Sequence, residues 1–339
     1  MALSLSFDIL SLKTRHPFTI ARGSTTAYRV VRVRLRDAEG REGWGEAAPS
    51  RYYGETADTV VAALGRLAPA LPADPSDLEA ADAALLRASP GDAAARVAVS
   101  AALHDLAGKR LGAPLWKLWG LDPARAPLSS FTIGLDTPER VQAKVREAAP
   151  YPILKIKVGT PDDAAVLRAV RDVTDKPLRV DANAGWTVSE ALAHLPLLEE
   201  MRVELIEQPV AADDVDGLAA VHRASRIPIV ADEACRTAAD VPRVAGAVDG
   251  INIKLAKCGS LQEALRMVEA ARAHRLSVMV GCMIETSLGI TAAAHLTPLL
   301  DLADLDGAAL LEWDPFVGAT IDGGRITLPT GPGLGVTAR

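Results

Sequence analysis

Short apolar runs alternate with amphipathic helical segments over most of the chain, and this alternation is the feature that most restricts its fold. Short runs rich in Val, Ile and Leu that alternate with helices are typical of a parallel sheet built from βα units. Eight successive units predict a TIM-type barrel, with an open doubly wound sheet as the alternative. The regular repeat and the lack of a GxGxxG motif after the first run favour the barrel. The eight runs cover residues 130–135, 153–159, 178–183, 203–209, 227–233, 250–256, 277–283 and 303–307.

The first 113 residues follow another pattern. Strand-like segments come first, at 4–12, 29–37 and 43–49, and helical segments follow at 56–71, 75–88 and 92–111. Strands followed by helices indicate a separate α+β module. The Gly/Pro-rich tail has a strand pattern near Gly323 and is expected to pack back on this module. We therefore divide the chain into an α+β domain (1–113), a barrel domain (114–319) and a returning tail (320–339).

Composition excludes several classes of protein. The 339 residues include 37 Lys and Arg against 43 Asp and Glu, a net charge of −6 that offers no basic surface for nucleic acid or anionic lipid. No apolar run approaches the ~18 residues of a membrane-spanning helix, and the first residues do not read as a signal peptide. Three cysteines without a CxxC pair suit a reducing compartment rather than disulfides or zinc. We expect a cytoplasmic protein with a small-molecule substrate and no nucleic-acid or membrane partner, and a homo-oligomer remains possible.

Acidic residues recur at the ends of consecutive predicted strands. Asp181, Glu207 and Asp232 are separated by 26 and 25 residues, which is one βα unit each, so they should lie at one level of the barrel. Three carboxylates so close would repel one another unless a cation lay between them. Oxygen ligands with open water positions suit Mg²⁺, and we expect one Mg²⁺ per subunit. Any one of these acids alone could instead cap a helix or pair with an arginine.

Lysines flank this ring of acids. Lys155 and Lys157 lie in the second predicted strand and Lys254 in the sixth, on the far side of the barrel mouth. Burial and a nearby divalent cation both lower a lysine pKa toward that of a general base. A metal-bound carboxylate substrate has an acidified α-proton, because the metal stabilises the enediolate that forms. One lysine would remove this proton and the other would return it on the opposite face, a 1,1-proton transfer. The alternative is that the lysines of the second strand are simply exposed, which suits a covered parallel strand poorly.

These motifs together resemble the enolase superfamily, and within it the muconate-lactonizing subgroup. The motifs KIK (155–157), VDANAGW (180–186), IEQP (206–209), ADE (231–233) and INIKLAKCGS (251–260) follow one another in the subgroup's order. Residues 95–120 are similar to the helix that joins its capping domain to its barrel. The resemblance covers essentially the whole chain. It implies a modified TIM barrel of the (β/α)7β type, with an α+β capping domain formed by the N-terminal segment and the C-terminal tail.

The resemblance also implies roles for the flanking residues. Lys157 is the base facing the L (S) substrate, Lys254 faces the D (R) form, and Lys155 lowers the pKa of its neighbour. Asn183 and Glu233 would orient the groups that bind metal and substrate.

A second set of residues points to the substrate. The DLDG segment that contains Asp304 and Asp306 resembles the DxD motif of epimerases acting on L-Ala-D/L-Glu, in which two acids hold the α-ammonium group. Segments 17–29 and 50–56 resemble the two substrate-covering loops of that family. Arg22 is the candidate for binding a side-chain carboxylate, although Thr25 stands where some members carry the arginine. The remaining expected substrate-binding residues are Tyr53, Thr132, Lys155 and Met283.

The predicted function is thus Mg²⁺-dependent epimerisation of dipeptides at the α-carbon of the C-terminal residue. An N-acylamino acid racemase or an o-succinylbenzoate synthase would use the same lysines and metal, and a muconate cycloisomerase is a more distant alternative. None of these substrates has a free ammonium group, so the two acids at 304 and 306 would have no role. Asp304 and Asp306 could instead cap a helix or form a turn before Gly307. A non-catalytic barrel that binds a metal or a peptide would not need a base on each face. The sequence leaves the preferred dipeptide and the physiological direction open.

Overall fold

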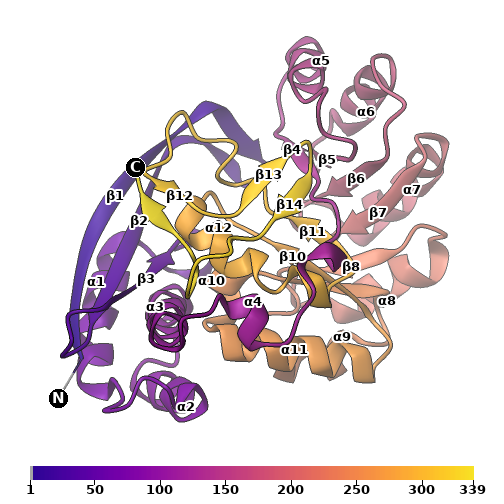
Figure 1. Ribbon diagram of the computed structural model, residues 1–339. Coiled ribbons are helices and arrows are strands. Elements are labelled where there is room, and N and C mark those ends of the chain that lie inside the picture. Colours follow the sequence, from indigo (N-terminus) through magenta and orange to yellow (C-terminus); the bar gives the residue numbers. More distant parts are fainter. Residues whose placement is uncertain (1–2) are drawn as a thin grey trace.

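Eight parallel strands form the centre of the computed structural model, which describes residues 3–339 (Figure 1). Neighbouring strands follow the order of the chain, and a bridge between Ser129 and Ala303 joins the first strand region to the last. Every predicted run overlaps one strand, which confirms the barrel and excludes the open doubly wound sheet. The strands are β4 (Phe131–Ile133), β5 (Leu154–Lys157), β6 (Leu178–Asp181), β7 (Val203–Glu207), β8 (Ile229–Ala231), β9 (Gly250–Ile253), β10 (Ser277–Gly281) and β11 (Leu302–Asp304).

Helices connect successive strands on the outside of the barrel. Seven connections carry helices, and β11 ends the series, which gives the expected (β/α)7β arrangement within the described residues. Thr187 and Ser260 cap the helices that follow them through their side-chain oxygens. The helices are α5 (Pro138–Glu147), α6 (Asp163–Arg171), α7 (Val188–Glu200), α8 (Val215–Ala224), α9 (Val241–Val244), α10 (Leu255–Cys258), α11 (Leu261–Ala273) and α12 (Ser287–Ala294).

The barrel interior is apolar in its middle and charged at the C-terminal ends of the strands. Leu205, Val230 and Met279 form a buried apolar cluster, and the half-buried Leu302 of a fourth strand packs against it. Alternation along a strand sends every second side chain inward, so the inward residue two positions after Leu205 is Glu207. The same two-residue step leads from Leu302 to Asp304. The apolar layer therefore supports the charged residues at the C-terminal ends of the strands.

The N-terminal part is a three-stranded antiparallel sheet covered by helices, as the sequence predicted. The strands are β1 (Ser4–Ile20), β2 (Gly23–Arg36) and β3 (Glu42–Ala47), and the helices are α1 (Ala57–Leu67), α2 (Leu78–Ala88) and α3 (Ala93–Leu111). Gly43 and Gly45 let β3 approach α3 closely, because a Cβ at either position would lie 2.0 Å from a carbonyl oxygen of that helix. Gly112 ends α3 in the left-handed conformation, with φ of 68°.

The first predicted covering loop is in fact the tip of a long hairpin. β1 and β2 continue pairing to Ile20 and Gly23, with a register shift between Lys13 and Phe18, so Ala21 and Arg22 form the turn. Leu135, which follows β4, donates a backbone hydrogen bond to Thr19 (2.9 Å). This contact places the tip of the hairpin at the C-terminal ends of the barrel strands. The second segment contains the short 3-10 helix Arg51–Tyr53.

The tail divides between two places. The β13–β14 hairpin (Thr320–Asp322 and Arg325–Thr327) reaches the start of the barrel strands, where Ser129 donates a backbone hydrogen bond to Gly324. The last segment returns to the N-terminal part, where Leu334 donates to Asp105 of α3. The tail adds no strand to the β1–β3 sheet; β12 (Phe316–Val317) pairs with β15 (Thr337–Ala338) instead. We propose the domain limits at 113/114 and 319/320 on this basis.

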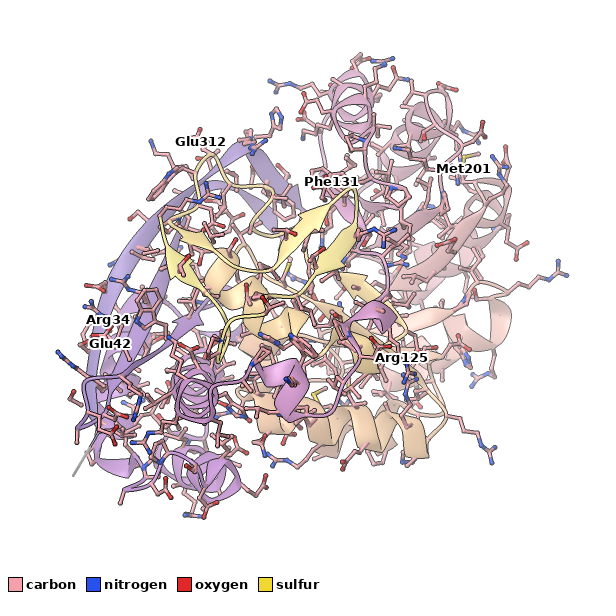
Figure 2. The ribbon with its side chains drawn as sticks, viewed as in Figure 1. Arg34, Glu42, Arg125, Phe131, Met201 and Glu312 are labelled. Carbon is pink, nitrogen blue, oxygen red and sulfur yellow. The ribbon has the colours of Figure 1, made fainter. Side chains whose placement is uncertain are left out.

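Side chains fill the space between these layers (Figure 2). Arg34 and Glu42, on the N-terminal sheet, lie at the opposite side of the molecule from Met201, which follows α7 of the barrel. Within residues 3–339, none of the helices has both the length and the apolar character needed to cross a membrane.

Candidate metal and proton-transfer site

Asp181, Glu207 and Asp232 meet at the C-terminal ends of three neighbouring strands. Asp181 and Glu207 end β6 and β7 and are register partners, and Asp232 follows β8 directly. One oxygen from each carboxylate lies within 4.8 Å of the others, and all three residues are buried. Glu207 Oε2 is buried and receives no well-aligned hydrogen bond. Three buried, converging carboxylates are a donor set that fits Mg²⁺.

The pKa values of the three acids diverge because their cationic neighbours differ. Burial would raise the pKa of Asp181, but the ammonium groups of Lys157 and Lys155 hold it well below its usual value. Burial likewise opposes a low pKa for Asp232, which the neighbouring lysines nevertheless keep well below its usual range. Burial and the charge of Asp181 raise the pKa of Glu207 to about 7. Glu207 is thus the acid whose charge is least compensated by the protein.

The lysines contact opposite ends of this row of acids. Lys157 Nζ lies 2.6 Å from Asp181 Oδ2, whereas Lys254 Nζ lies 2.7 Å from Asp232 Oδ2. Lys254 follows the last residue of β9 rather than lying within the strand. Lys155 Nζ lies between the ends, 2.8 Å from Glu207 Oε2. The structure therefore places Lys157 and Lys254 at opposite ends of the row of acids.

The carboxylates oppose the lowering of lysine pKa that burial would produce. For Lys254, burial lowers the pKa, but the charges of Asp232 and Glu207 raise it above the usual value. For Lys155, the charges of Asp304 and Glu207 outweigh burial in the same way. The protein groups alone thus keep these amines protonated, and the sequence-based expectation of a lowered pKa depends on a bound cation.

Asn183 contacts both Lys157 and Asp181, and Glu233 contacts Asn183. Asn183 Oδ1 accepts a hydrogen bond from Lys157 Nζ (3.0 Å), and its backbone N–H donates to Asp181 Oδ1 (2.8 Å). Glu233 Oε1 is within 3.4 Å of Asn183 Nδ2. These contacts fix the orientation of Lys157 relative to Asp181.

Two supporting residues were not among the predicted site residues. Lys257 is buried and contacts Asp232 at both its backbone oxygen (2.5 Å) and its carboxylate. Asn252 Nδ2 donates to Glu207 Oε1 (2.9 Å). Asn252 precedes Lys254 by two residues, so strand alternation could have identified it as an inward residue.

Asp304 and Asp306 lie beside the first barrel strand. Asp304 accepts hydrogen bonds from Lys155 Nζ and Ser130 Oγ, both at 2.7 Å. Asp306 accepts a hydrogen bond from the backbone N–H of Thr132 (2.6 Å). Thr132, another predicted substrate-binding residue, therefore lies beside the two acids. Burial and the charge of Asp304 raise the pKa of Asp306 to about 7, whereas Lys155 keeps that of Asp304 low despite its burial.

The other predicted substrate-binding residues, Arg22, Tyr53 and Met283, lie in different surroundings. Arg22 pairs with Glu233 (2.8 Å) and stacks on Tyr52, with 4.2 Å from Cζ to the ring centroid. Burial and the charges of Asp232 and Glu233 raise the pKa of Tyr53, and Arg236 stacks on its ring, with 4.5 Å from Cζ to the ring centroid. Met283 instead packs in an apolar cluster between the N-terminal sheet and the barrel. Its backbone N–H donates to Glu285.

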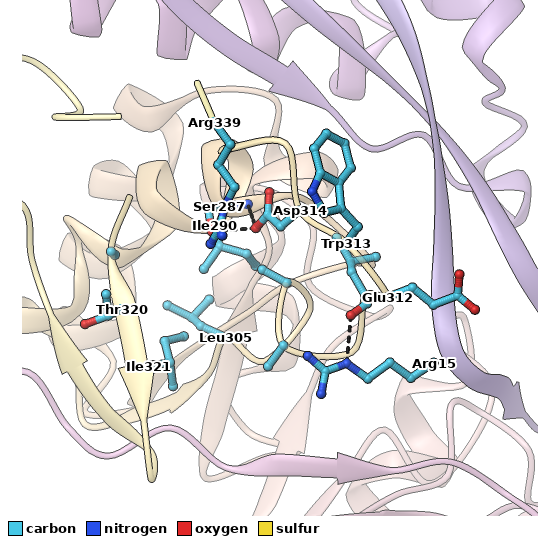
Figure 3. Close-up of a pocket in the computed structure, with 14 residues that line it drawn as sticks. Arg15, Ser287, Ile290, Leu305, Glu312, Trp313, Asp314, Thr320, Ile321 and Arg339 are labelled. Atoms are coloured by element: carbon cyan, nitrogen blue, oxygen red, sulfur yellow. Dashed lines mark hydrogen bonds between the residues drawn. The ribbon is translucent and has the colours of Figure 1, made fainter. Parts of the chain in front are cut away.

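A separate cleft of about 320 Å³ lies outside this site (Figure 3). It is bordered by Arg15, Trp313 and Arg339, and Arg15 Nε donates to the backbone oxygen of Leu311 (2.9 Å). None of the metal-binding acids or the lysines around them borders it. The acid-lysine site is compact because its side chains contact one another.

Comparison with known proteins places this geometry in a family. The chain matches the model of the mandelate racemase/muconate lactonizing enzyme N-terminal domain over residues 7–120 and that of the enolase C-terminal domain-like family over residues 137–339. An L-Ala-D/L-Glu epimerase of Bacteroides thetaiotaomicron is 43% identical over 336 residues, covering 98% of this chain and 88% of that protein.

Solved structures agree with this assignment. A dipeptide epimerase from Cytophaga hutchinsonii, complexed with Mg and D-Ala-L-Val, has a TM-score of 0.95 and 30% identity, covering 100% of this chain and 96% of that one. The substrate-liganded L-Ala-D/L-Glu epimerase from Bacillus subtilis has a TM-score of 0.95 and 33% identity, covering 100% and 99%. With both domains matched and the acids and lysines in place, the chain belongs to the mandelate racemase/muconate lactonizing enzyme family of the enolase superfamily.

Proposed function

We propose that this protein is a Mg²⁺-dependent dipeptide epimerase that inverts the α-carbon of the C-terminal residue. Its similarity to dipeptide epimerases covers nearly the whole chain. The observation that carries the proposal is the arrangement of Lys157 and Lys254 at opposite ends of the three acids. Binding alone would not require a base at each end.

Each lysine moves a proton on its own face of the substrate. Lys157 removes the α-proton of the L-epimer and Lys254 delivers a proton to the other face; the roles exchange for the D-epimer. Asn183 and Asp181 hold the amine of Lys157 in place. Asp181, Glu207 and Asp232 would hold Mg²⁺, whose positive charge would lower the pKa values of the neighbouring amines and stabilise the negative charge that develops on the substrate carboxylate.

Asp304 and Asp306 favour a substrate with a free ammonium group. Asp306 has no cationic partner within 4.0 Å in the part of the chain that the structure describes, and its pKa is raised to about 7 by burial and by Asp304. A substrate ammonium group next to it would compensate this buried charge. The negatively charged N-succinyl group of an N-acylamino acid, or an o-succinylbenzoate precursor, would be repelled there. The group formed by Asp304, Asp306 and Thr132 thus supports a dipeptide over these alternatives.

The test is solvent exchange with a library of L,L-dipeptides. The protein is incubated with Mg²⁺ in D₂O, and α-deuteration and epimer composition are read by mass spectrometry and chiral separation. We expect deuterium at the C-terminal residue together with the L,D-epimer, and loss of epimerisation in Lys157→Ala and in Lys254→Ala. Exchange confined to N-succinylated amino acids would contradict the dipeptide assignment, and normal turnover by both variants would contradict the two-base mechanism.

A further inference from the structure

Arg22, at the tip of the β1–β2 hairpin, is attached to the barrel rather than left free for a ligand. Its Nη1 donates to the backbone oxygen of Asn183 (2.6 Å) and to Glu233 Oε1 (2.8 Å). The side chain of Glu233 is 1% exposed, so the ion pair is shielded on the barrel side. Tyr52 covers a face of the guanidinium group. The charge of Arg22 is therefore already compensated, which leaves it little to offer a substrate carboxylate.

The backbone that Arg22 binds is strained. Asn183 and Ala184 have φ values of 47° and 61°, a left-handed conformation that is uncommon for alanine in particular. Ala184 donates a backbone hydrogen bond to Gln208 of the barrel (2.9 Å), and Gly185 donates one to Ala182 within the turn itself (2.8 Å). The hydrogen bond from Arg22 to the carbonyl of Asn183 is the contact from the hairpin side. Removing it would relax the turn that carries Asn183.

Asn183 connects this turn to one catalytic amine only. Its Oδ1 accepts a hydrogen bond from Lys157 Nζ at 3.0 Å. Lys254 is held instead by Asp232, on the other side of the row of acids. Replacing Arg22 should therefore alter the position of Lys157, through the Arg22–Asn183 and Asn183–Lys157 contacts, and leave the position of Lys254 unchanged.

We propose that Arg22 is a positioning residue that couples closure of the hairpin over the site to the alignment of Lys157, through Asn183 and Glu233. This inference rests on the proposed epimerase function and assigns Arg22 a different role from binding the side chain of the substrate. It also implies that the need for Arg22 does not depend on an acidic second residue in the dipeptide.

The test compares exchange at the two epimers in an Arg22→Met variant. In D₂O with Mg²⁺, initial deuteration of an L,L-dipeptide reports proton removal by Lys157, and that of the L,D-epimer reports removal by Lys254. We expect exchange from the L,L-epimer to fall about 10–100-fold relative to exchange from the L,D-epimer, the usual effect of losing a contact behind a functional group. Epimerisation should fall in both directions, because each conversion of one epimer into the other uses both lysines. The ratio of the two exchange rates does not depend on the fraction of folded protein.

The substrates and controls separate the possible results. L-Ala-L-Glu and L-Ala-L-Ala should be affected by the same factor, and Arg29→Met, which removes an exposed arginine of the same hairpin, should leave the ratio unchanged. A loss confined to L-Ala-L-Glu would show that Arg22 binds the substrate side chain and would overturn the inference. An equal loss at both epimers would show that Arg22 acts only in covering the site, which also overturns it. If wild-type protein exchanges neither epimer of any dipeptide, the proposed function itself is wrong.

Discussion

Replacing Lys257 by methionine should weaken Mg²⁺ binding although Lys257 belongs to neither the metal ligands nor the bases. Its side chain is 1% exposed, and its amine contacts Asp232 at both the carboxylate and the backbone oxygen. It also donates to the backbone oxygen of Asn252 (3.0 Å). Methionine has a similar length but no donor, so these acceptors lose their partner while the volume remains filled.

The expected size of the effect follows from these contacts. Removing one partner of a buried ion pair typically costs about 3–5 kcal/mol of unfolding free energy. Asp232 retains Lys254 at 2.7 Å, so the loss should lie at the lower end of that range, about 3 kcal/mol. Because Lys257 also orients a metal-binding carboxylate, the affinity for Mg²⁺ should fall about 10–100-fold.

Calorimetric titration with Mg²⁺ and urea unfolding of the metal-free protein measure the two effects separately. Lys109→Met is a matched control: Lys109 binds Asp105 at 2.7 Å and the backbone oxygen of Glu42 in the N-terminal domain, far along the chain from the acids. It should lower stability without changing Mg²⁺ affinity. Wild-type affinity in Lys257→Met would refute the conclusion that Lys257 orients Asp232 for the metal.

Three further predictions concern packing, pH and metal. Gly45→Ala should lower the unfolding free energy by about 1–3 kcal/mol, because the new Cβ would lie 2.0 Å from the carbonyl oxygen of Ala98. Gly65→Ala is the control, because a Cβ there would enter open space on α1 and should not lower stability. Equal urea midpoints for the two variants would contradict this prediction. Burial and the charge of Glu285 raise the pKa of Glu46 to about 8. The folded state thus binds more protons than the unfolded state between about pH 4.5 and 8, so this contribution to stability is lost as pH rises, and Glu46→Gln should reduce the difference in urea stability between pH 6 and 8. Mg²⁺ at 100 times its Kd should add about 2.7 kcal/mol of unfolding free energy, and EDTA should abolish both this gain and epimerisation.

The barrel and its ring of acids could be predicted from the sequence because both follow from short-range periodicity. The βα repeat sets the level of each strand end, so the spacing of Asp181, Glu207 and Asp232 already implies convergence. The register of β6 with β7 then pairs Asp181 directly with Glu207. Charged residues on dry, covered strands also have few explanations other than function.

The hairpin could not be predicted in the same way. The alternation in β1 is lost where the register shifts between Lys13 and Phe18, so the sequence suggested a loop from Pro17 onward. What extends the strands to Ile20 is tertiary contact, including the backbone hydrogen bond from Leu135 to Thr19. The partner of Arg22 depends on this docking, and no local pattern reveals it.

Lys257 and Asn252 show where periodicity stops being informative within a single motif. Asn252 lies in β9, so a two-residue step from Lys254 would have placed its side chain inside the barrel. Lys257 lies beyond the end of that strand, in the short helix α10, where the chain turns and a step of two residues no longer applies. Its amine nevertheless contacts Asp232, which directly follows the neighbouring strand β8. The residues that bind the metal can therefore be found by counting along strands, whereas the residues that hold them in place depend on turns whose geometry only the folded chain defines.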